Sequence, residues 1–458
     1  MADLSTRFMG IPTPNPFWLA SAPPTNTGEQ VMRAFDAGWG GAVWKTIGEP
    51  VVNTASRYSS VDWNGQRMMG LNNIELISDR PVETNLREIT EVKKRYPKHT
   101  VIASLMVESK REVWHEIVKR AEAAGADGLE LNFGCPHGMS ERGMGAAVGQ
   151  VPEYSCMITE WVKEAARTPV MVKLTPNVTD IRAVARAARR GGADALSAIN
   201  TINSITGIDL DTLTPRPDVG GLSAHGGYCG PAVKPIALHL VQQIASDPEV
   251  GLPISGIGGV SGWREAAEFI LVGCGTVQVC TAAMHYGYRI VEDMIEGLAN
   301  WMDDKGYRTL EDFRGLSIPK MTEWKHLDLN YKIVARIDPS KCIGCDLCYV
   351  ACWDGAHQCI HHEGSRETPA ARQAASTARI AVTPIAKLDG GGAAHGPAGA
   401  ANGRTPHVDE EECVGCNLCS LVCPVESCIT MVEVKTGKPK ESWEQRTSGR
   451  SYARPGQE

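Results

Sequence analysis

Two short cysteine runs near the C-terminus constrain the fold of this chain more than any other feature. Both have the spacing Cys-x2-Cys-x2-Cys-x3-Cys, over Cys342–Cys352 and Cys413–Cys423, and proline follows the second run where Trp353 follows the first. This spacing is typical of bacterial domains with two [4Fe–4S] clusters, in which the fourth cysteine of each run ligates the other cluster. The predicted ligand sets are Cys342, Cys345, Cys348 and Cys423 for one cluster, and Cys413, Cys416, Cys419 and Cys352 for the second.

These runs predict a ferredoxin-like α+β domain over residues 332–434. Zinc is the alternative occupant of such thiol sites, but two interleaved runs with a Cys-Pro ending favour iron–sulfur clusters. Cys359 and Cys428 lie just outside the runs, and we expect them to be buried thiols. Residues 363–404 are rich in Ala, Gly and Ser, which predicts a flexible insertion, and residues 435–458 are expected to form a loose tail.

The length, net charge and cysteine count of the chain exclude several classes of protein. A chain of 458 residues is too long for one ordinary core, and its net charge of −7 offers no basic face for nucleic acid. No apolar run is long enough to span a membrane and no signal peptide is present, so we expect a soluble cytoplasmic protein. In such a chain, 15 cysteines indicate metal ligation or catalysis rather than a disulfide framework.

Residues 1–305 alternate between short apolar runs and helix-length stretches with apolar residues at three- and four-residue spacing. Eight strands with intervening helices predict an α/β fold of the (β/α)8 TIM-barrel type, and residues 306–331 are expected to be a connector. An open, doubly wound sheet is the alternative, although no Gly-x-Gly-x-x-Gly turn follows the first strand. The predicted strands are Phe17–Ser21, Gly41–Thr46, Val101–Val107, Gly128–Phe133, Val170–Leu174, Ala195–Asn200, Pro253–Gly256 and Thr276–Cys280.

A glycine-rich loop after the fourth predicted strand carries chemically active side chains: Cys135, His137, Glu141 and Arg142. Barrel enzymes keep their active sites at the carboxyl ends of the strands, and the glycines of this loop would let it move over a substrate. A thiol with a pKa near ~8.5 is largely protonated at neutral pH and can donate its proton. We therefore predict that Cys135 is a proton donor, the alternative being an inert buried thiol.

Two features of the predicted barrel favour a flavin. The turn Gly256–Val260 and the end of the eighth strand, Gln278–Thr281, lie where barrels bind phosphate, although the glycines alone also suit tight turns. Lys45 and Lys173 interrupt apolar runs, and a ring that gains negative charge on reduction would supply a partner, with a structural ion pair as the alternative. Amides at or near strand ends suit the alternating donors and acceptors of a cyclic imide, although each alone also suits a turn.

Taken together, these motifs resemble those of the dihydropyrimidine dehydrogenase family, in its bacterial NAD-dependent form and in the C-terminal half of the single-chain animal enzyme. The resemblance covers about Pro14 to Val432, without most of the insertion. It is carried by Asn15–Phe17, Ala20–Ala22, Leu71–Leu76, Asn132–Gly138, Lys173–Asn177, Ile199–Thr201 and Gly258–Gly259.

The resemblance implies roles for individual residues. Cys135 corresponds to the general acid on a mobile loop, with His137, Glu141 and Arg142 around it. The pyrimidine-binding positions are Asn73, Asn132, Asn200 and Thr201. The FMN-binding positions are Ser21, Lys45, Thr46, Lys173, Gly258, Gly259, Cys280 and Thr281.

The resemblance also implies an activity, the reversible reduction of uracil and thymine. Flavin N5 would give hydride to ring carbon C6, and Cys135 would give a proton to C5. The chain has no dinucleotide fingerprint, so the resemblance implies that NADH acts through a separate FAD- and NADH-binding subunit of the PreT type. Electrons would pass through the clusters in a heterotetramer of two subunits of each kind. A dihydroorotate dehydrogenase-like flavoenzyme and a non-catalytic electron carrier are the alternative functions.

Overall fold

The computed structural model describes residues 2–49, 51–135, 143–362 and 405–448. The chain divides into two compact units, which we call the barrel unit (Met1–Met321) and the cluster unit (Thr322–Glu458). The division falls within the expected connector 306–331. The first part of this connector belongs to the barrel unit, because Leu310 and Phe313 are buried in the barrel's main hydrophobic core.

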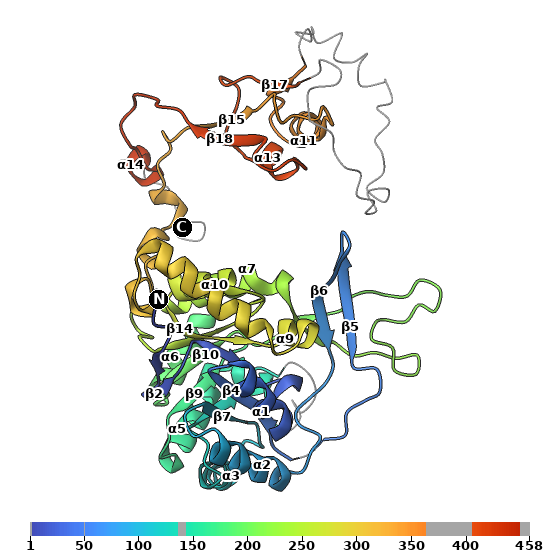
Figure 1. Cartoon of the computed structure of the whole chain (residues 1–458), viewed down its shortest axis with the longest axis vertical. Coiled ribbons are helices and arrows are strands. Elements are labelled where there is room, and N and C mark those ends of the chain that lie inside the picture. Colours follow the sequence, from blue (N-terminus) through green and yellow to red (C-terminus); the bar gives the residue numbers. More distant parts are fainter. Residues whose placement is uncertain (1, 50, 136–142, 363–404, 449–458) are drawn as a thin grey trace, which may run out of the picture. The chain divides into compact units, whose positions relative to one another are not determined.

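The barrel unit is built on a closed ring of eight parallel strands (Figure 1). The last strand pairs with the first, with Val277 opposite Phe17, so the sheet is a barrel and not an open sheet. The predicted fold class is confirmed, and each predicted strand overlaps a strand of the ring. In chain order these are β3 (Phe17–Leu19), β4 (Gly41–Ile47), β7 (Thr100–Leu105), β8 (Gly128–Asn132), β9 (Val170–Lys173), β10 (Ala195–Ala198), β13 (Ile254–Ile257) and β14 (Cys274–Val279).

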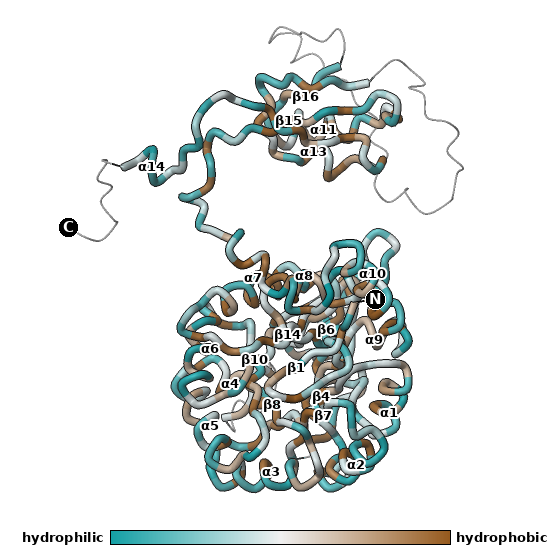
Figure 2. The backbone as a smooth tube through the Cα atoms, turned by 60° about the vertical axis from the view of Figure 1, so that its left-hand side comes forward, coloured by the Kyte–Doolittle hydropathy of each residue, from teal (hydrophilic) through white to brown (hydrophobic). Residues whose placement is uncertain are grey.

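Amphipathic helices cover the ring. In α6 (Ile181–Arg190), Ile181, Val184 and Ala188 are buried against the strands, and the side chain of Asp180 caps the first turn by accepting from the Arg182 amide. Hydrophilic residues lie along the outer rim of the unit (Figure 2). The other helices are α1 (Gly28–Ala37), α2 (Val82–Arg95), α3 (Arg111–Ala123), α4 (Ala146–Gly149), α5 (Pro152–Ala165), α7 (Lys234–Ala245), α8 (Trp263–Leu271), α9 (Thr281–Tyr286) and α10 (Ile290–Lys305).

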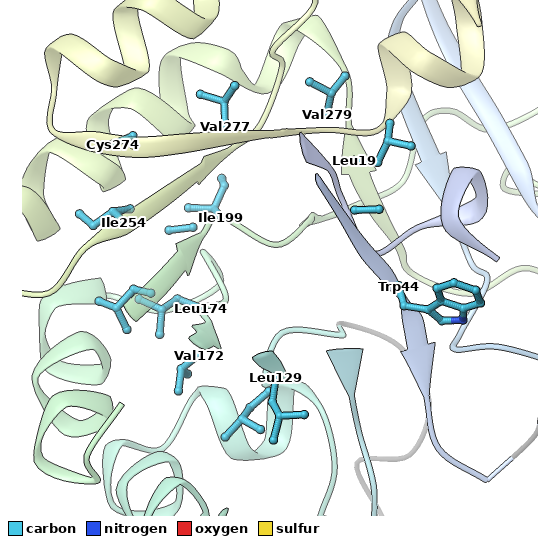
Figure 3. Packing of buried hydrophobic residues seen from close by; sticks show 14 of the residues in the cluster. Leu19, Trp44, Leu129, Val172, Leu174, Ile199, Ile254, Cys274, Val277 and Val279 are labelled. Carbon is cyan, nitrogen blue, oxygen red and sulfur yellow. The ribbon is translucent and has the colours of Figure 1, made fainter. Parts of the chain in front are cut away.

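Parallel strands with helices outside and side chains inside are buried on both faces. Leu129, Val172 and Val277 belong to the core between strands and helices (Figure 3). Inside the ring, Phe8 of the hairpin β1 (Thr6–Phe8) and β2 (Ile11–Thr13) packs edge-on against Trp18, with ring centroids 5.5 Å apart. This apolar cluster fills part of the barrel interior.

A second sheet is joined to the barrel, and the sequence did not predict it. Its antiparallel strands, in spatial order, are β11 (Ile202–Ser204), β12 (Gly226–Cys229), β6 (Gln66–Asn73) and β5 (Tyr58–Trp63). The hairpin of β5 and β6 projects away from the ring (Figure 1). Position 70 accepts only glycine, because a Cβ there would lie 1.7 Å from the hydroxyl oxygen of Tyr228.

The cluster unit contains two small antiparallel pairs of strands. β15 (Ile333–Ile337) pairs with β18 (Ile429–Glu433), and β16 (Ile360–His361) pairs with β17 (His407–Val408). Helices α11 (Leu347–Gly355) and α13 (Leu418–Leu421) begin inside the two cysteine runs. The predicted flexible insertion 363–404 lies outside the described residues.

Part of the expected loose tail has regular structure. Ser442 forms a β-bridge with Asp328, and α14 (Trp443–Thr447) follows it. Short 3₁₀ helices occur at η1 (Pro23–Thr25), η3 (Pro231–Val233), η4 (Leu310–Asp312), η5 (Ile318–Lys320) and η6 (Trp324–His326). Among the described residues, no helix combines the length and apolar character needed to cross a bilayer.

Candidate active site and cluster sites

The inner face of the barrel changes from apolar to polar toward the carboxyl ends of its strands. Residues two apart on a strand point to the same face, so the polar residues lie inside the barrel above the apolar ones. Barrel enzymes carry their active sites at this end. The buried pairs are Val43 and Lys45, Ile102 and Ser104, Met171 and Lys173, and Ala195 and Ser197.

A cavity with about 910 Å³ of empty space, part of it open to solvent, is lined by these strand ends. Gly259 and Thr281 do not line it, but each directly follows a lining residue, and His137, Glu141 and Arg142 lie outside the described residues. The predicted site residues that line the cavity are Ser21, Lys45, Thr46, Asn73, Asn132, Cys135, Lys173, Asn200, Thr201, Gly258 and Cys280.

A chain of hydrogen bonds fixes two of the amides that line the cavity. The Asn200 side-chain amide donates to Asn132 Oδ1 at 2.9 Å, and the Asn132 amide donates to the Thr46 hydroxyl at 2.9 Å. Behind them, Ser104 and Ser197 each donate to a different carboxylate oxygen of Glu130, at 3.0 and 2.9 Å. A network whose members are all bonded is rigid, so the amides present a fixed set of donors and acceptors to a ligand.

The two predicted lysines have different surroundings. Lys173 Nζ donates to Ser21 Oγ at 3.4 Å and lies 3.9 Å from Glu130 Oε1, which has no solvent exposure. An ammonium carries three hydrogen-bond donors, and the hydrogen bond from Lys173 to Ser21 is long. Lys173 can therefore donate to a ligand in the cavity.

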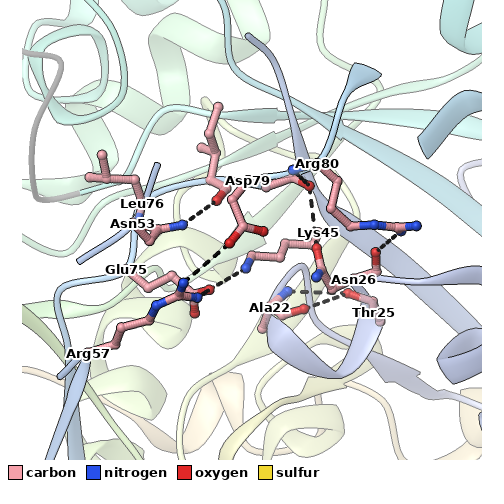
Figure 4. Close-up of polar contacts among 12 residues, drawn as sticks. Ala22, Thr25, Asn26, Lys45, Asn53, Arg57, Glu75, Leu76, Asp79 and Arg80 are labelled. Carbon is pink, nitrogen blue, oxygen red and sulfur yellow. Dashed lines mark hydrogen bonds and ion pairs between the residues drawn. The ribbon is translucent and has the colours of Figure 1, made fainter. Parts of the chain in front are cut away.

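Lys45 is held by a residue to which sequence reasoning gave no role. Its Nζ lies 2.5 Å from Glu75 Oε1, and both side chains are about one-twentieth exposed. The Arg57 guanidinium donates to the same carboxylate oxygen at 3.0 Å and also reaches Asp79 (Figure 4). Glu75 follows β6 and not a barrel strand, so the strand-end rule that found the lysines could not select it.

Tyr58 adds a third contact to this carboxylate, because its hydroxyl donates to Glu75 Oε2. Burial and the neighbouring carboxylate raise the pKa of Tyr58, which keeps the phenol a hydrogen-bond donor. Tyr58, Glu75 and Tyr228 line the cavity together with Asn73. The sheet that the sequence did not predict thus forms one wall of the site.

The turn after β13 requires glycine at two positions. Gly258 and Gly259 have φ of +129° and +72°, and a Cβ on Gly259 would lie 2.7 Å from the backbone nitrogen of Lys234. Backbone amides in such a turn before a helix bind anions. This glycine turn and the donor capacity of Lys173 both fit a flavin with a phosphate tail.

Thiols form part of the wall. Cys135 is buried and packs with Met106 and Met144. Burial raises the pKa of Cys280 and of Cys229, which accepts a hydrogen bond from the Thr281 hydroxyl at 3.2 Å. Cys229 was not predicted as a site residue, because it belongs to β12 of the unpredicted sheet.

In the cluster unit, the cysteines converge on two small cavities. One is lined by Cys413, Cys416, Cys419 and Cys352, with Cys359 beside them. The other is lined by Cys342, Cys345, Cys348 and Cys423, with Cys428 beside them. Each group therefore combines three thiols of one run with the fourth of the other run, and four thiolates around one space suit an iron–sulfur cluster.

Comparisons with known proteins agree with this division. Residues 3–302 match the family described as dihydroorotate dehydrogenase, and residues 341–427 match the 4Fe-4S dicluster domain family. The chain is 42% identical, over 95% of its length and 97% of the relative, to the NAD-dependent dihydropyrimidine dehydrogenase subunit PreA of Escherichia coli strain K12. The chain belongs to the dihydropyrimidine dehydrogenase family.

Two further relatives come from a plant and an archaeon. The chloroplastic dihydropyrimidine dehydrogenase (NADP+) of Arabidopsis thaliana is 44% identical over 71% of this chain and 79% of that protein. The catalytic subunit of dihydroorotate dehydrogenase B (NAD+) from Pyrococcus abyssi is 35% identical over 69% of this chain and 99% of that subunit. As a member of the dihydropyrimidine dehydrogenase family, the chain is an oxidoreductase with a flavin-type barrel and an iron–sulfur domain.

Proposed function

We propose that this chain is the catalytic subunit of a dihydropyrimidine dehydrogenase. It reduces uracil and thymine reversibly to 5,6-dihydrouracil and 5,6-dihydrothymine, with electrons that come from NADH. The observation that carries this proposal is the cavity at the carboxyl end of the barrel, where Cys135 lies together with the amides of Asn73, Asn132 and Asn200.

FMN is the flavin that we propose for the barrel. Ser21, Lys45, Thr46 and Lys173 bind its ring, and the turns at Gly258–Gly259 and Cys280–Thr281 bind its phosphate. When bound, FMN supplies from N5 the hydride that adds to C6 of the pyrimidine. Lys173 compensates negative charge near the ring, because it is a buried ammonium with long contacts to Ser21 and Glu130.

The amides orient the pyrimidine. Asn73, Asn132, Asn200 and Thr201 supply the donors and acceptors that match the N–H and C=O groups of the ring. The hydrogen bonds among Asn200, Asn132 and Thr46 hold two of these amides before substrate arrives, which lowers the cost of orienting it. One face of the pyrimidine is thereby turned toward Cys135.

Cys135 is the acid of the reaction. Its Sγ holds a proton and gives it to C5 of the pyrimidine, and the resulting thiolate takes a proton back from solvent or a neighbouring group. We assign His137, Glu141 and Arg142 of the same loop to the surroundings of this thiol, on the basis of their place in the sequence.

Electrons enter through the cluster unit. We propose two [4Fe–4S] clusters, one in each cysteine-lined cavity, and a separate FAD- and NADH-binding subunit of the PreT type as the electron donor. The assembly is a heterotetramer with two subunits of each kind. This partner supplies the dinucleotide site whose fingerprint the chain lacks.

The test measures uracil-dependent NADH oxidation by the chain, reconstituted anaerobically with iron, sulfide and FMN, with and without the FAD-containing subunit. Cys135→Ala is expected to lower kcat by about 10²- to 10⁴-fold while FMN content stays unchanged. Cys156→Ala removes a partly exposed thiol of α5 and serves as the matched control. Full turnover in Cys135→Ala would remove the acid assignment, and turnover of dihydroorotate but not of uracil would favour the dihydroorotate dehydrogenase alternative.

A further inference from the structure

Asp346 and Asn417 occupy equivalent places in the two cluster sites. Asp346 follows Cys345 and lines the cavity of the Cys342 set, whereas Asn417 follows Cys416 and lines the cavity of the Cys413 set. Both residues precede the helix of their run and have left-handed backbones, with φ of 59° and 68°. Asn and Asp adopt this conformation more readily than other residues that carry a side chain. The two positions therefore differ in charge and not in backbone structure.

One side-chain oxygen of each residue is buried. Among the described residues, Oδ1 of Asp346 and Oδ1 of Asn417 are buried and accept no hydrogen bond. The Nε2 atom of the His362 ring lies 3.5 Å from Asp346 Oδ1. Asp346 thus lines this cavity with a carboxylate whose buried oxygen accepts no hydrogen bond in the described part of the chain.

The first three cysteines of the two runs match in exposure. The first and third cysteines of each run are buried, and the second is exposed in both. Apart from the cysteines, Asp346 is the ionisable residue that lines one cavity, and His357 is the one that lines the other. One site therefore has a negatively charged wall and the other does not.

We infer that Asp346 gives the cluster of the Cys342 set a lower reduction potential than the cluster of the Cys413 set, beside Asn417. This inference rests on the proposed function, because it requires a [4Fe–4S] cluster in each cavity. Reduction adds one electron and makes a cluster more negative by one charge, and a nearby carboxylate opposes this change. One electron delivered by the NADH-oxidising subunit then resides mainly on the cluster beside Asn417.

A backbone contact acts in the opposite direction but is weaker. The Gly344 amide donates to Cys342 Sγ at 3.4 Å, and a hydrogen bond to a ligating sulfur raises a cluster's potential. A single amide dipole at this distance interacts less strongly than the full charge of a carboxylate that lines the same cavity. Asp346 therefore outweighs this contact within the Cys342 set.

The test exchanges the two side chains. Asp346→Asn, Asn417→Asp and the double exchange are made in the full-length, anaerobically reconstituted chain, and cluster reduction is followed by EPR during titration with dithionite. Asp346→Asn is expected to make reduction of the lower-potential cluster about tenfold more favourable, which is ~59 mV for one electron. Asn417→Asp is expected to lower the other potential by a similar amount. Glu410→Gln, which removes an exposed carboxylate paired with Arg336 outside both cavities, is expected to shift neither.

Two failures are distinguishable. Wild-type protein that binds fewer than about eight iron atoms per chain would contradict the proposed pair of clusters, and the inference would fall with it. Full iron content with unchanged potentials in both single variants would overturn the inference about Asp346 alone. Because Asn417 adopts the same left-handed conformation in the second run, Asp346→Asn is expected to leave the loop conformation intact.

Discussion

At the scale of single residues, Glu75 is the side chain on which the polar wall of the cavity depends. It binds Lys45, Arg57 and Tyr58 at once and is almost fully buried. We expect Glu75→Gln to lower the free energy of unfolding by about 3–5 kcal/mol, because it leaves the buried Lys45 ammonium without its anion. Urea denaturation of the flavin-free protein measures this directly, separately from any change in flavin binding.

Asp79→Asn is the matched control. Asp79 binds the same Arg57 guanidinium at 3.3 Å, but its side chain is about one-third exposed, so its loss should cost about 0–1 kcal/mol. If both variants lowered the free energy of unfolding equally, burial of the Lys45–Glu75 pair would not explain the loss of stability.

Glu75 and Glu130 also show what the sequence could not predict. Lys45, Lys173, Asn132 and Cys135 were found because strand-end polar residues in a barrel point into its mouth. Glu130 lies within an apolar strand, and its contacts come from Ser104 and Ser197 on neighbouring strands. Such partners are separated by dozens of residues, so only the folded barrel identifies them.

At the scale of elements, the glycine turn after β13 makes a sharp prediction. In Gly259→Ala, the new Cβ would lie 2.7 Å from the backbone nitrogen of Lys234, so the turn must move away from α7. We expect the variant to lose most of its FMN, measured by absorbance after gel filtration, and to be less stable than the wild type.

Gly306→Ala separates this close contact from backbone strain. Gly306 ends α10 with φ of +75°, close to the +72° of Gly259, but a Cβ there would meet no atom within 4 Å. Its cost should be the left-handed strain alone, about 1–2 kcal/mol, with full FMN content. Equal loss of FMN in both variants would contradict a role for the turn in flavin binding.

Elements that depend on local pattern were predicted, and those that depend on distant pairing were not. Most barrel strands are short apolar runs followed by a helix, and a single sequence reveals this pattern. The four-stranded sheet of β11, β12, β6 and β5 pairs β6 with β12. Asn73 lies opposite Gly227, about 150 residues away in the chain. Its strands are polar and partly exposed, so neither an apolar run nor a neighbouring turn marked them.

At the scale of the whole molecule, the two units should differ in what holds them together. The barrel unit has an extensive apolar core of strand and helix residues. In the described part of the cluster unit, the buried core consists of Val334, Ala335, Ile360 and Ile429 together with cysteines, most of them predicted ligands. A core this small does not stabilise a domain without additional links, and metal–thiolate bonds would provide them.

Removal of iron should therefore unfold one unit and spare the other. We expect anaerobic calorimetry of the loaded protein to show two transitions. Chelation of iron should abolish the transition of the cluster unit and leave the barrel transition within about 2 °C of its original position. Removal of FMN from iron-loaded protein is the converse control, because it should lower only the barrel transition by mass action. If chelation lowered both transitions equally, the units would not be independent, and the clusters would stabilise the barrel as well as the domain whose cysteines surround them.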